Sequence, residues 1–347
     1  MKHWPARRHA LALCTVLPAL LRVSDASAQV LESAPPYVER EAVQRFIERM
    51  VAQHGFEAGA LATVFRAARG SSQVAQLIQP PPPGFRRSWK AYRARFVEPV
   101  RIREGLAFWQ QHRSAVLRAA ATYGVRPEYM VAIIGVETVY GRDTGSFRVI
   151  DALSTLSFDV PRRADYFQEE LEQYLLLARE QRFDPLEARG SFAGAMGLPQ
   201  FMPGSIRRHA VDFDGDGRID LHRSPADAVG SVGRFLANHG WEPDGPTHYP
   251  ARVENPERAA AVLGSGSPPE WTAADLAQHG VSSTRPLPAD RKLYLVDLQR
   301  GDGTTQYVLG AQNFYVITRY NRSFFYAMAV IELAEALRQA ASQAVKR

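Results

Sequence analysis

The chain has 347 residues, of which 46% are hydrophobic and 22% charged, and its formal net charge is +6. This composition is ordinary for a globular protein with a sizeable core, arranged as one large domain or two smaller ones. The mild basic surplus is compatible with an anionic polymer as partner. The sequence has no basic stripe interleaved with aromatic residues, so nucleic-acid binding is not expected.

The first 28 residues have the pattern of a cleavable secretory signal. Basic residues precede an apolar run from Ala10 to Leu21, and Ala26-Ser27-Ala28 is typical of a cleavage site. The single cysteine, Cys14, lies in this segment, so the mature chain would have neither a disulfide nor a cysteine metal site. Leu13 before it does not favour a lipid anchor. The pattern therefore predicts a periplasmic protein.

Helical patterns dominate the chain up to residue 124. Apolar residues at helical spacing predict one helix over 43–51 and a second over 61–68. The prolines and glycine at 80–84 cannot join a helix or a central strand, so they predict a stiff extended connector. One long helix is expected to pass through 106–120 and to end at Gly124.

The next helix carries an acid, Glu137, inside an apolar run. The run begins at Pro127, which suits a first helical turn, and stops at Gly141, which suits the residue after a helix. Glu137 shares the helical stripe of Met130 and Ile133, so we expect it to face the core. Burial and the negative end of the helix dipole would both raise its pKa, which suits a general acid. The alternative is a buried glutamate paired with an arginine.

Beyond this helix the pattern becomes mixed. Helices are predicted over 167–178 and 229–236, and a final one over 326–341. Residues 242–290 are rich in proline, glycine and serine and predict irregular structure.

Short strand-like runs lie near residues 290–320. Lys292–Leu298 and Thr304–Leu309 flank Gly301-Asp302-Gly303, which predicts a hairpin. Phe314–Thr318 is β-branched and aromatic and predicts another strand. The sequence therefore predicts a mainly α (α+β) fold with a small antiparallel β insertion late in the chain.

A glycine-rich stretch from Gly190 to Pro203 is the second informative feature. Glycine lets the backbone approach a ligand closely, while Ser191 and Gln200 offer neutral hydrogen bonds of the kind that sugars need. Taken alone, the stretch is more typical of a structural turn.

Together these stretches resemble the membrane-bound lytic murein transglycosylase B family, glycoside hydrolase family 103, which has a lysozyme-like fold. The resemblance covers essentially the mature chain and implies N-terminal helices and a connector over 29–84 and a lysozyme-like catalytic domain over 85–347. It rests on five motifs in order: Gly135–Gly141, Asp151–Phe158, Pro161–Phe167, Gly190–Pro203 and Ile317–Asn321.

The family's reaction cleaves the β-1,4 bond between N-acetylmuramic acid and N-acetylglucosamine and leaves a 1,6-anhydromuramic acid end. Ordinary glycosidases use two carboxylates. Here Glu137 stands out, and we expect no second acid in an apolar or glycine-rich site near the motifs. The resemblance therefore implies that Glu137 acts first as acid and then as base, without an organic cofactor.

The resemblance also implies a set of glycan-binding residues. Ser191 and Asn321 would bond the N-acetyl or muramoyl part, and Gln200 would lie near the catalytic acid. Arg162 and Arg163 would meet lactyl or peptide carboxylates. Stacking or hydroxyl contacts would come from five aromatic residues: Tyr92, Tyr166, Phe201, Tyr320 and Tyr326. By themselves, such aromatics are more often core and an arginine pair a solvated face.

The stretch 212–227 partly matches a calcium-binding loop. Aspartates stand at ligand positions 1, 3 and 5 and a glycine at position 6, but Arg223 replaces the bidentate glutamate of position 12. The alternative is a solvated acidic turn. The family is similar here, which implies a structural Ca²⁺ held by four carboxylates and one backbone carbonyl: Asp212, Asp214, Asp216, Asp227 and the carbonyl of Arg218.

Three functions remain compatible with the sequence. The first is a peptidoglycan lytic transglycosylase, and the second is a hydrolytic muramidase that adds water. The third is a non-catalytic calcium-binding or cell-wall-binding protein. Peptidoglycan glycan strands are the expected partner, nucleic acid is not expected, and the sequence does not indicate which other cell-wall enzymes the chain would meet.

Overall fold

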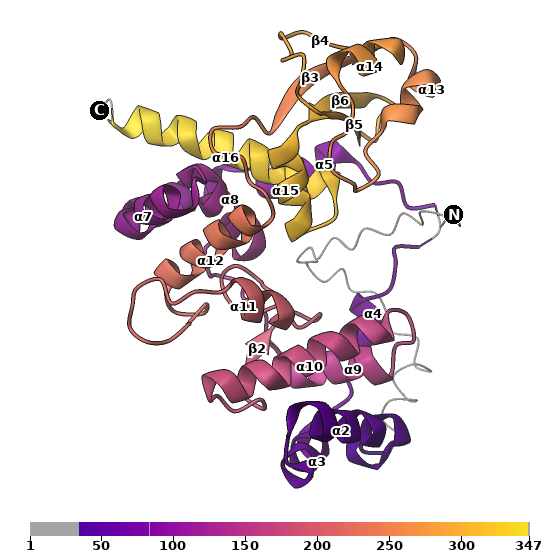
Figure 1. Ribbon diagram of the computed structural model, residues 1–347, viewed down its shortest axis with the longest axis vertical. Coiled ribbons are helices and arrows are strands. Elements are labelled where there is room, and N and C mark those ends of the chain that lie inside the picture. Colours follow the sequence, from indigo (N-terminus) through magenta and orange to yellow (C-terminus); the bar gives the residue numbers. More distant parts are fainter. Residues whose placement is uncertain (1–34, 83, 346–347) are drawn as a thin grey trace. The chain divides into compact units, whose positions relative to one another are not determined.

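Figure 1 shows the computed structural model of the chain, which describes residues 35–82 and 84–345. The predicted signal segment and Cys14 lie outside these residues. Contacts divide the described chain into a first unit, residues 84–140 and 229–345, and a second unit, residues 35–82 and 141–228. None of the helices described here combines the length and the apolar content that crossing a membrane requires.

The second unit consists mainly of helices. Its N-terminal elements are η1 (Tyr37–Glu39), α2 (Glu41–His54), α3 (Ala58–Ala67) and α4 (Ser72–Leu77). Its later elements are β1 (Phe147–Arg148), α9 (Val149–Phe158), α10 (Ala164–Gln181), β2 (Arg189–Gly190), α11 (Pro203–His209) and the start of α12 (Pro225–Asn238). The helices α9 and α10 lie side by side, α4 packs on α9, and α11 packs on α10 (Figure 1). The strands β1 and β2 pair antiparallel.

The first unit surrounds one helix with three others. Its helices outside the sheet region are α5 (Trp89–Phe96), α6 (Pro99–Gln111), α7 (Arg113–Tyr123), α8 (Pro127–Thr138), the rest of α12, α15 (Gln312–Tyr320) and α16 (Phe324–Val345). The helix α8 packs against α6, α7 and α16. Every residue of α8 except Pro127 and Glu137 is consequently buried. This helix is buried on all sides, rather than amphipathic with a single core-facing stripe as its spacing suggested.

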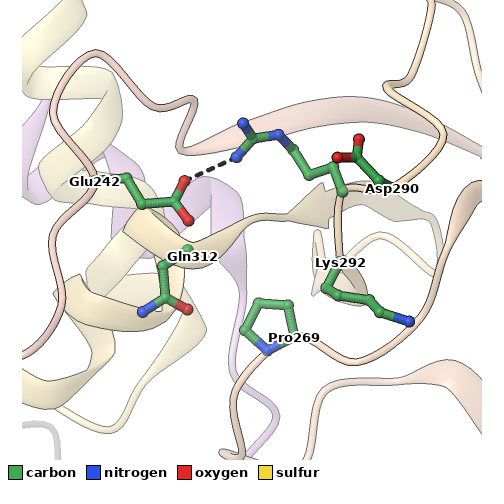
Figure 2. A pocket seen from close by; sticks show the side chains of 6 residues that line it. Glu242, Pro269, Asp290, Lys292 and Gln312 are labelled. Atoms are coloured by element: carbon green, nitrogen blue, oxygen red, sulfur yellow. Dashed lines mark hydrogen bonds and ion pairs between the residues drawn. The ribbon is translucent and has the colours of Figure 1, made fainter.

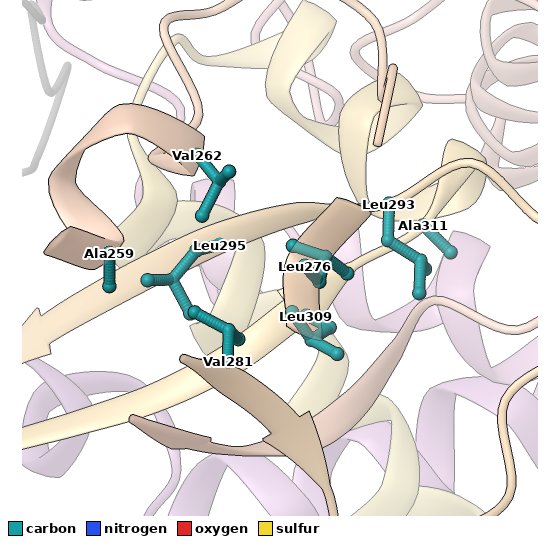
Figure 3. Packing of buried hydrophobic residues seen from close by; sticks show 8 residues of the cluster. All are labelled: Ala259, Val262, Leu276, Val281, Leu293, Leu295, Leu309 and Ala311. Atoms are coloured by element: carbon teal, nitrogen blue, oxygen red, sulfur yellow. The ribbon is translucent and has the colours of Figure 1, made fainter. Parts of the chain in front are cut away.

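A four-stranded antiparallel sheet completes the first unit. Its order is β4-β3-β6-β5. The strands are β3 (His248–Val253), β4 (Val281–Ser283), β5 (Tyr294–Gln299) and β6 (Thr305–Gly310), accompanied by α13 (Pro256–Ala259), η2 (Ala260–Val262) and α14 (Ala273–Gln278). Leu295 and Leu309 from paired positions of the sheet form a small core with Leu276 of α14 and Val262 of η2 (Figure 3). The predicted hairpin is confirmed, and the sheet region spans 248–310 instead of about 290–320.

Pro250 lies inside the strand β3, and a proline there made irregular structure the expected reading of this region. Pro250 lacks the N–H that a central strand needs on one of its sides. Residues 248–250 pair with β6, whereas residues 251–253 pair with β4. Each half of β3 therefore has one paired side, and the proline is tolerated at a nominally central position.

Two other predicted elements are wrong. The long helix expected over 106–120 is two helices, α6 and α7, because His112 leaves the helical conformation with φ −109° and ψ 26°. The strand expected over 314–318 lies inside the helix α15. Phe314, Ile317 and Thr318 are buried at helical spacing, and α15 packs against α16, so tertiary packing overrides the β propensity of these residues.

Candidate active site

Glu137 lies in the last turn of α8 and is the partly exposed acid of an otherwise buried helix. Tyr326, a buried residue near the start of α16, donates its hydroxyl hydrogen to Glu137 Oε1 at 2.6 Å. Burial raises the pKa of Glu137 to about 8, although the hydrogen bond from Tyr326 opposes the rise. Such a carboxyl is largely protonated at neutral pH and can donate its proton. In the described part of the chain, Glu137 forms no ion pair with an arginine.

Three more predicted site residues lie in the first unit. Tyr320 stacks on Tyr326 with ring centroids 6.3 Å apart and an interplanar angle of 14°. Burial and the charge of Glu137, with smaller effects of Tyr320 and Tyr92, raise the pKa of Tyr326 far above its ordinary range, so its hydroxyl stays protonated. Asn321 is 8% exposed, and its buried Oδ1 has no hydrogen-bond partner within the described residues. The first unit thus gathers tyrosines around its acid.

The backbone after Glu137 leaves the helix in an unusual way. Val139, Tyr140 and Gly141 have φ values of 50°, 59° and 93°. A left-handed conformation is an outlier for a β-branched residue such as Val139. Each strained residue of this type costs on the order of 1–3 kcal/mol, and functional sites commonly contain them. The predicted helix end at Gly141 is therefore wrong, since α8 stops at Thr138.

The glycine-rich loop of the second unit holds Gln200 and Ser191. Met196 and Phe201 exchange backbone hydrogen bonds of 2.8 and 3.1 Å, which close a turn. Gln200 has φ 50° in this turn, and its side-chain nitrogen donates to two backbone carbonyls at 2.9 and 3.1 Å. Ser191 Oγ accepts from two backbone amides at 3.0 and 3.3 Å. Phe201 is 2% exposed, which is typical of a core ring.

The predicted arginine pair precedes α10 in the second unit. Arg162 and Arg163 are both exposed. Arg163 has φ 66° at the start of α10, and its guanidinium lies 4.2 Å from the ring centroid of Tyr166. Arg163 and Tyr166 therefore form one cation–π pair.

A second buried carboxyl lies close to the glycine-rich loop. Glu170 of α10 is 7% exposed, and its Oε2 accepts the N–H of Gly204 at 2.8 Å. Burial raises its pKa, and the bond from Gly204 opposes the rise. The expectation that no second acid occupies such a place is therefore wrong. Its burial could have been predicted from helical spacing, because Glu170 shares one helical stripe with Phe167, Leu171 and Tyr174. The polar residues next to it in the sequence obscured this pattern.

The acidic loop brings three predicted metal ligands together in the second unit. Carboxylate oxygens of Asp212, Asp214 and Asp227 lie within 4.8 Å of one another, and Asp227 is 1% exposed. Hard oxygen donors in this arrangement fit Ca²⁺. Asp216 is not part of this group, and its Oδ1 accepts the N–H of Arg218 at 2.9 Å.

A cavity of about 400 Å³ lies elsewhere in the first unit (Figure 2). Its lining consists of mostly polar residues: Glu242, Pro269, Asp290, Arg291, Lys292 and Gln312. Glu242 is paired with Arg291 across it at 2.8 Å. The cavity includes none of the predicted site residues, so we do not assign it to the active site.

A partly exposed acid with a raised pKa, hydrogen-bonded to a tyrosine hydroxyl in a helical fold, is typical of enzymes that protonate a leaving oxygen. The family model "Transglycosylase SLT domain" matches residues 39–335. Membrane-bound lytic murein transglycosylase B of Escherichia coli (strain K12) is 41% identical over 316 residues, which cover 89% of this chain and 86% of the relative. The chain therefore belongs to the transglycosylase SLT domain family, and it is an enzyme.

Solved structures agree with this assignment. The catenated lytic transglycosylase SltB1 from Pseudomonas aeruginosa has a TM-score of 0.82 and 44% identity, covering 88% of this chain and 99% of that chain. The Escherichia coli lytic transglycosylase Slt35 in complex with calcium has a TM-score of 0.78 and 41% identity, covering 90% and 98%. SltB3 from Pseudomonas aeruginosa in complex with NAG-anhNAM-pentapeptide has a TM-score of 0.74 and 28% identity, covering 85% and 78%. They confirm the mainly α fold with small antiparallel sheets.

Proposed function

We propose that this enzyme cleaves the β-1,4 bond between N-acetylmuramic acid and N-acetylglucosamine in peptidoglycan and forms a 1,6-anhydromuramic acid end. The observation that carries the proposal is Glu137, a partly exposed acid whose pKa is raised to about 8 beside the Tyr326 hydroxyl. The names of its relatives as lytic murein transglycosylases support it, as does the NAG-anhNAM-pentapeptide bound by a solved neighbour.

Bond cleavage uses Glu137 as the acid. The carboxyl gives its proton to the glycosidic oxygen while the bond from that oxygen to C1 of the muramoyl sugar breaks. The bonding electrons leave with that oxygen, and the positive charge at C1 is shared with the ring oxygen and stabilised by the substrate's N-acetyl group or by the Glu137 carboxylate. Glu137 is then a carboxylate, and the Tyr326 hydroxyl that donates to Oε1 at 2.6 Å stabilises its new charge.

Ring closure uses the same residue as the base. The Glu137 carboxylate takes the proton of the C6 hydroxyl while that oxygen bonds to C1, which forms the anhydro ring and restores the protonated acid. The attacking oxygen belongs to the substrate, so the step gains the large advantage of an intramolecular reaction. One C–O bond breaks, one forms, and no water is consumed.

The remaining site residues are assigned to glycan contacts within their own units. Asn321, whose buried Oδ1 has no hydrogen-bond partner among the described residues, suits an N-acetyl or muramoyl N–H, and Tyr320 and Tyr92 suit sugar hydroxyls. In the second unit the same proposal covers four polar or charged side chains and one aromatic ring: Ser191, Gln200, Arg162, Arg163 and Tyr166. Phe201 is 2% exposed, so its ring supports the loop from within and is not available to stack on a sugar.

Two further parts of the proposal concern metal and location. We infer that Asp212, Asp214 and Asp227 hold a structural Ca²⁺, since a solved neighbour has calcium bound. The metal would stabilise the fold and would take no part in proton transfer. We also infer export to the periplasm, because peptidoglycan lies there and the first 28 residues have a signal pattern.

The substitution Glu137→Gln tests the proposal directly. Glutamine keeps the size of the side chain and its hydrogen-bonding capacity but cannot deliver a proton, so turnover of purified sacculi should fall at least about 10²–10⁴-fold. Circular dichroism and co-sedimentation with sacculi should show an intact fold and retained binding. Substantial turnover by the folded variant would mean that another residue is the acid.

A further inference from the structure

Two glycines on neighbouring helices of the first unit make room for one aromatic ring. A Cβ added to Gly105 of α6 would lie 2.1 Å from Tyr140 Oη, and one added to Gly135 of α8 would lie 2.4 Å from the same atom. Both distances are too short for any real side chain. Tyr140 therefore occupies a notch that exists because both helices carry glycine at this level.

The ring of Tyr140 fills this notch. Its Oη is buried and has no hydrogen-bond partner within the described residues, and its ring lies 5.5 Å from the ring of Phe108. The residue sits in the left-handed turn with φ 59°, three positions after Glu137. The ring, whose hydroxyl end is buried, thus anchors a turn that a bulky side chain would not adopt by its own preference.

Arg101 contacts the same helix end at Gly135, which precedes Glu137 in the sequence, whereas Tyr140 follows it. It is 7% exposed, and its Nε donates to the carbonyl oxygen of Gly135 at 2.7 Å. The same guanidinium donates to the carbonyl of Arg95. The Gly135 oxygen also accepts the N–H of Val139 at 3.2 Å, which is the last helical bond before the turn. A buried cation therefore fixes the carbonyl two residues before Glu137.

We propose that Tyr140 and Arg101 are positioning residues that hold Glu137 against Tyr326. The inference rests on the proposed role of Glu137 and adds what keeps that acid in place. Among the described residues neither side chain hydrogen-bonds to the Glu137 carboxyl: Arg101 donates to backbone carbonyls, and Tyr140 Oη has no partner. They clamp the backbone at positions 135 and 140, on both sides of Glu137, in a turn that is otherwise strained. Losing either clamp lets the turn relax, so the Glu137 carboxyl becomes better hydrated and less well aimed.

The test compares Tyr140→Ala with Tyr140→Phe. The alanine variant empties the notch and should lower kcat on sacculi at least about tenfold with little change in KM, because misplacement by about 1 Å costs up to roughly 10²-fold. Its high-pH limb of kcat/KM should also move to lower pH, since a hydrated Glu137 ionises more readily. The phenylalanine variant keeps the ring and should restore both the rate and the pH profile.

Val116→Ala is the control for a general loss of core packing in the same unit. Val116 is fully buried in α7, which packs against α8, and its side chain cannot form a hydrogen bond. This variant should lower the melting temperature and leave the pH limb where it is. If Val116→Ala moves the pH limb as far as Tyr140→Ala does, the effect is general loosening and the inference is overturned.

Arg101→Met keeps the test decisive if Tyr140→Ala does not fold. Methionine retains apolar bulk but removes the bond to the Gly135 carbonyl, so the same fall in kcat and the same shift in the pH limb are expected. Wild-type kcat and pH profile in a folded clamp variant would overturn the inference. If Glu137→Gln is inactive at the same time, the proposed function stands; if Glu137→Gln is active, the proposed function itself fails.

Discussion

The hydroxyl of Tyr326 tunes the acid that it contacts. Its hydrogen bond to Glu137 favours the carboxylate form and so holds the pKa of Glu137 below the value that burial alone would give. In Tyr326→Phe the pKa of Glu137 should rise, and the high-pH limb of kcat/KM should move to higher pH because cleavage needs the protonated acid. The carboxylate formed during the reaction loses a donor, so kcat should fall roughly tenfold or more, as a hydrogen bond to a charged group contributes about 1.5–3 kcal/mol. Full pH–rate profiles check both effects, and a limb that moves downward would contradict this account.

The raised pKa of Glu137 also makes folding stability depend on pH. Between the ordinary value of 4.5 and about 8 the folded protein holds a proton that the unfolded chain has released. Stability from this group is therefore complete below pH 4.5 and is lost as pH rises through about 8. Urea unfolding should show that the free energy of unfolding of the wild type falls relative to that of Glu137→Gln from pH 5 to pH 8. Parallel curves for the two proteins would show that Glu137 titrates normally.

At the scale of single residues, the sequence made some residues of the site recognisable and left others hidden. Glu137 was recognisable because an acid inside an apolar run is unusual. Arg101 was not, since an arginine in a charged helix is typical of a solvated face, and only the packing of α6 on α8 shows that it is buried. Glu170 was hidden in the same way by its polar neighbours. Which polar residues become buried depends on contacts between distant segments.

The acidic loop is the element whose proposed role is structural. If Asp212, Asp214 and Asp227 hold Ca²⁺, the metal stabilises the folded state by binding to it preferentially. Removing calcium should lower the melting temperature, roughly 2–4 °C for each kcal/mol of binding free energy lost, while the rate on sacculi at 25 °C changes little.

Asp214→Asn sharpens the calcium prediction, because it removes one exposed carboxylate charge with almost no change of shape. Added calcium should raise the melting temperature of this variant less than that of wild type. Asp165→Asn, an exposed acid of α10 in the same unit, is the control and should respond like wild type. An unchanged melting temperature of wild type on chelation would argue that the loop is an ordinary acidic turn.

Elements were predictable where local chemistry decides them. The hairpin between β5 and β6 followed from its Gly-Asp-Gly turn, and α8 followed from Pro127 at its first position. The strand β3 was hidden by Pro250, whose tolerance depends on which side of each half is paired. The break at His112 has no proline or glycine to announce it. The left-handed turn after Glu137 depends on a notch between two helices, which no local pattern shows.

At the scale of the whole molecule the motifs are shared between the two units. Glu137, Tyr320, Asn321 and Tyr326 belong to the first unit, whereas the arginine pair, the glycine-rich loop and the acidic loop belong to the second. The order of the motifs along the chain was enough to predict the family and the mainly α fold. The grouping of tyrosines around the acid within the first unit required the structure, because residues 137 and 326 are far apart in sequence.

The central claim is that the substrate's own C6 oxygen, and not water, completes the reaction. The most direct measurement is mass spectrometry of the fragments that the enzyme releases from purified sacculi in water enriched in heavy oxygen. Every new muramoyl end should be an anhydro end, lighter by one water than a hydrolysed end and free of the heavy isotope. New reducing ends that carry heavy oxygen would contradict the account and identify the enzyme as a hydrolytic muramidase.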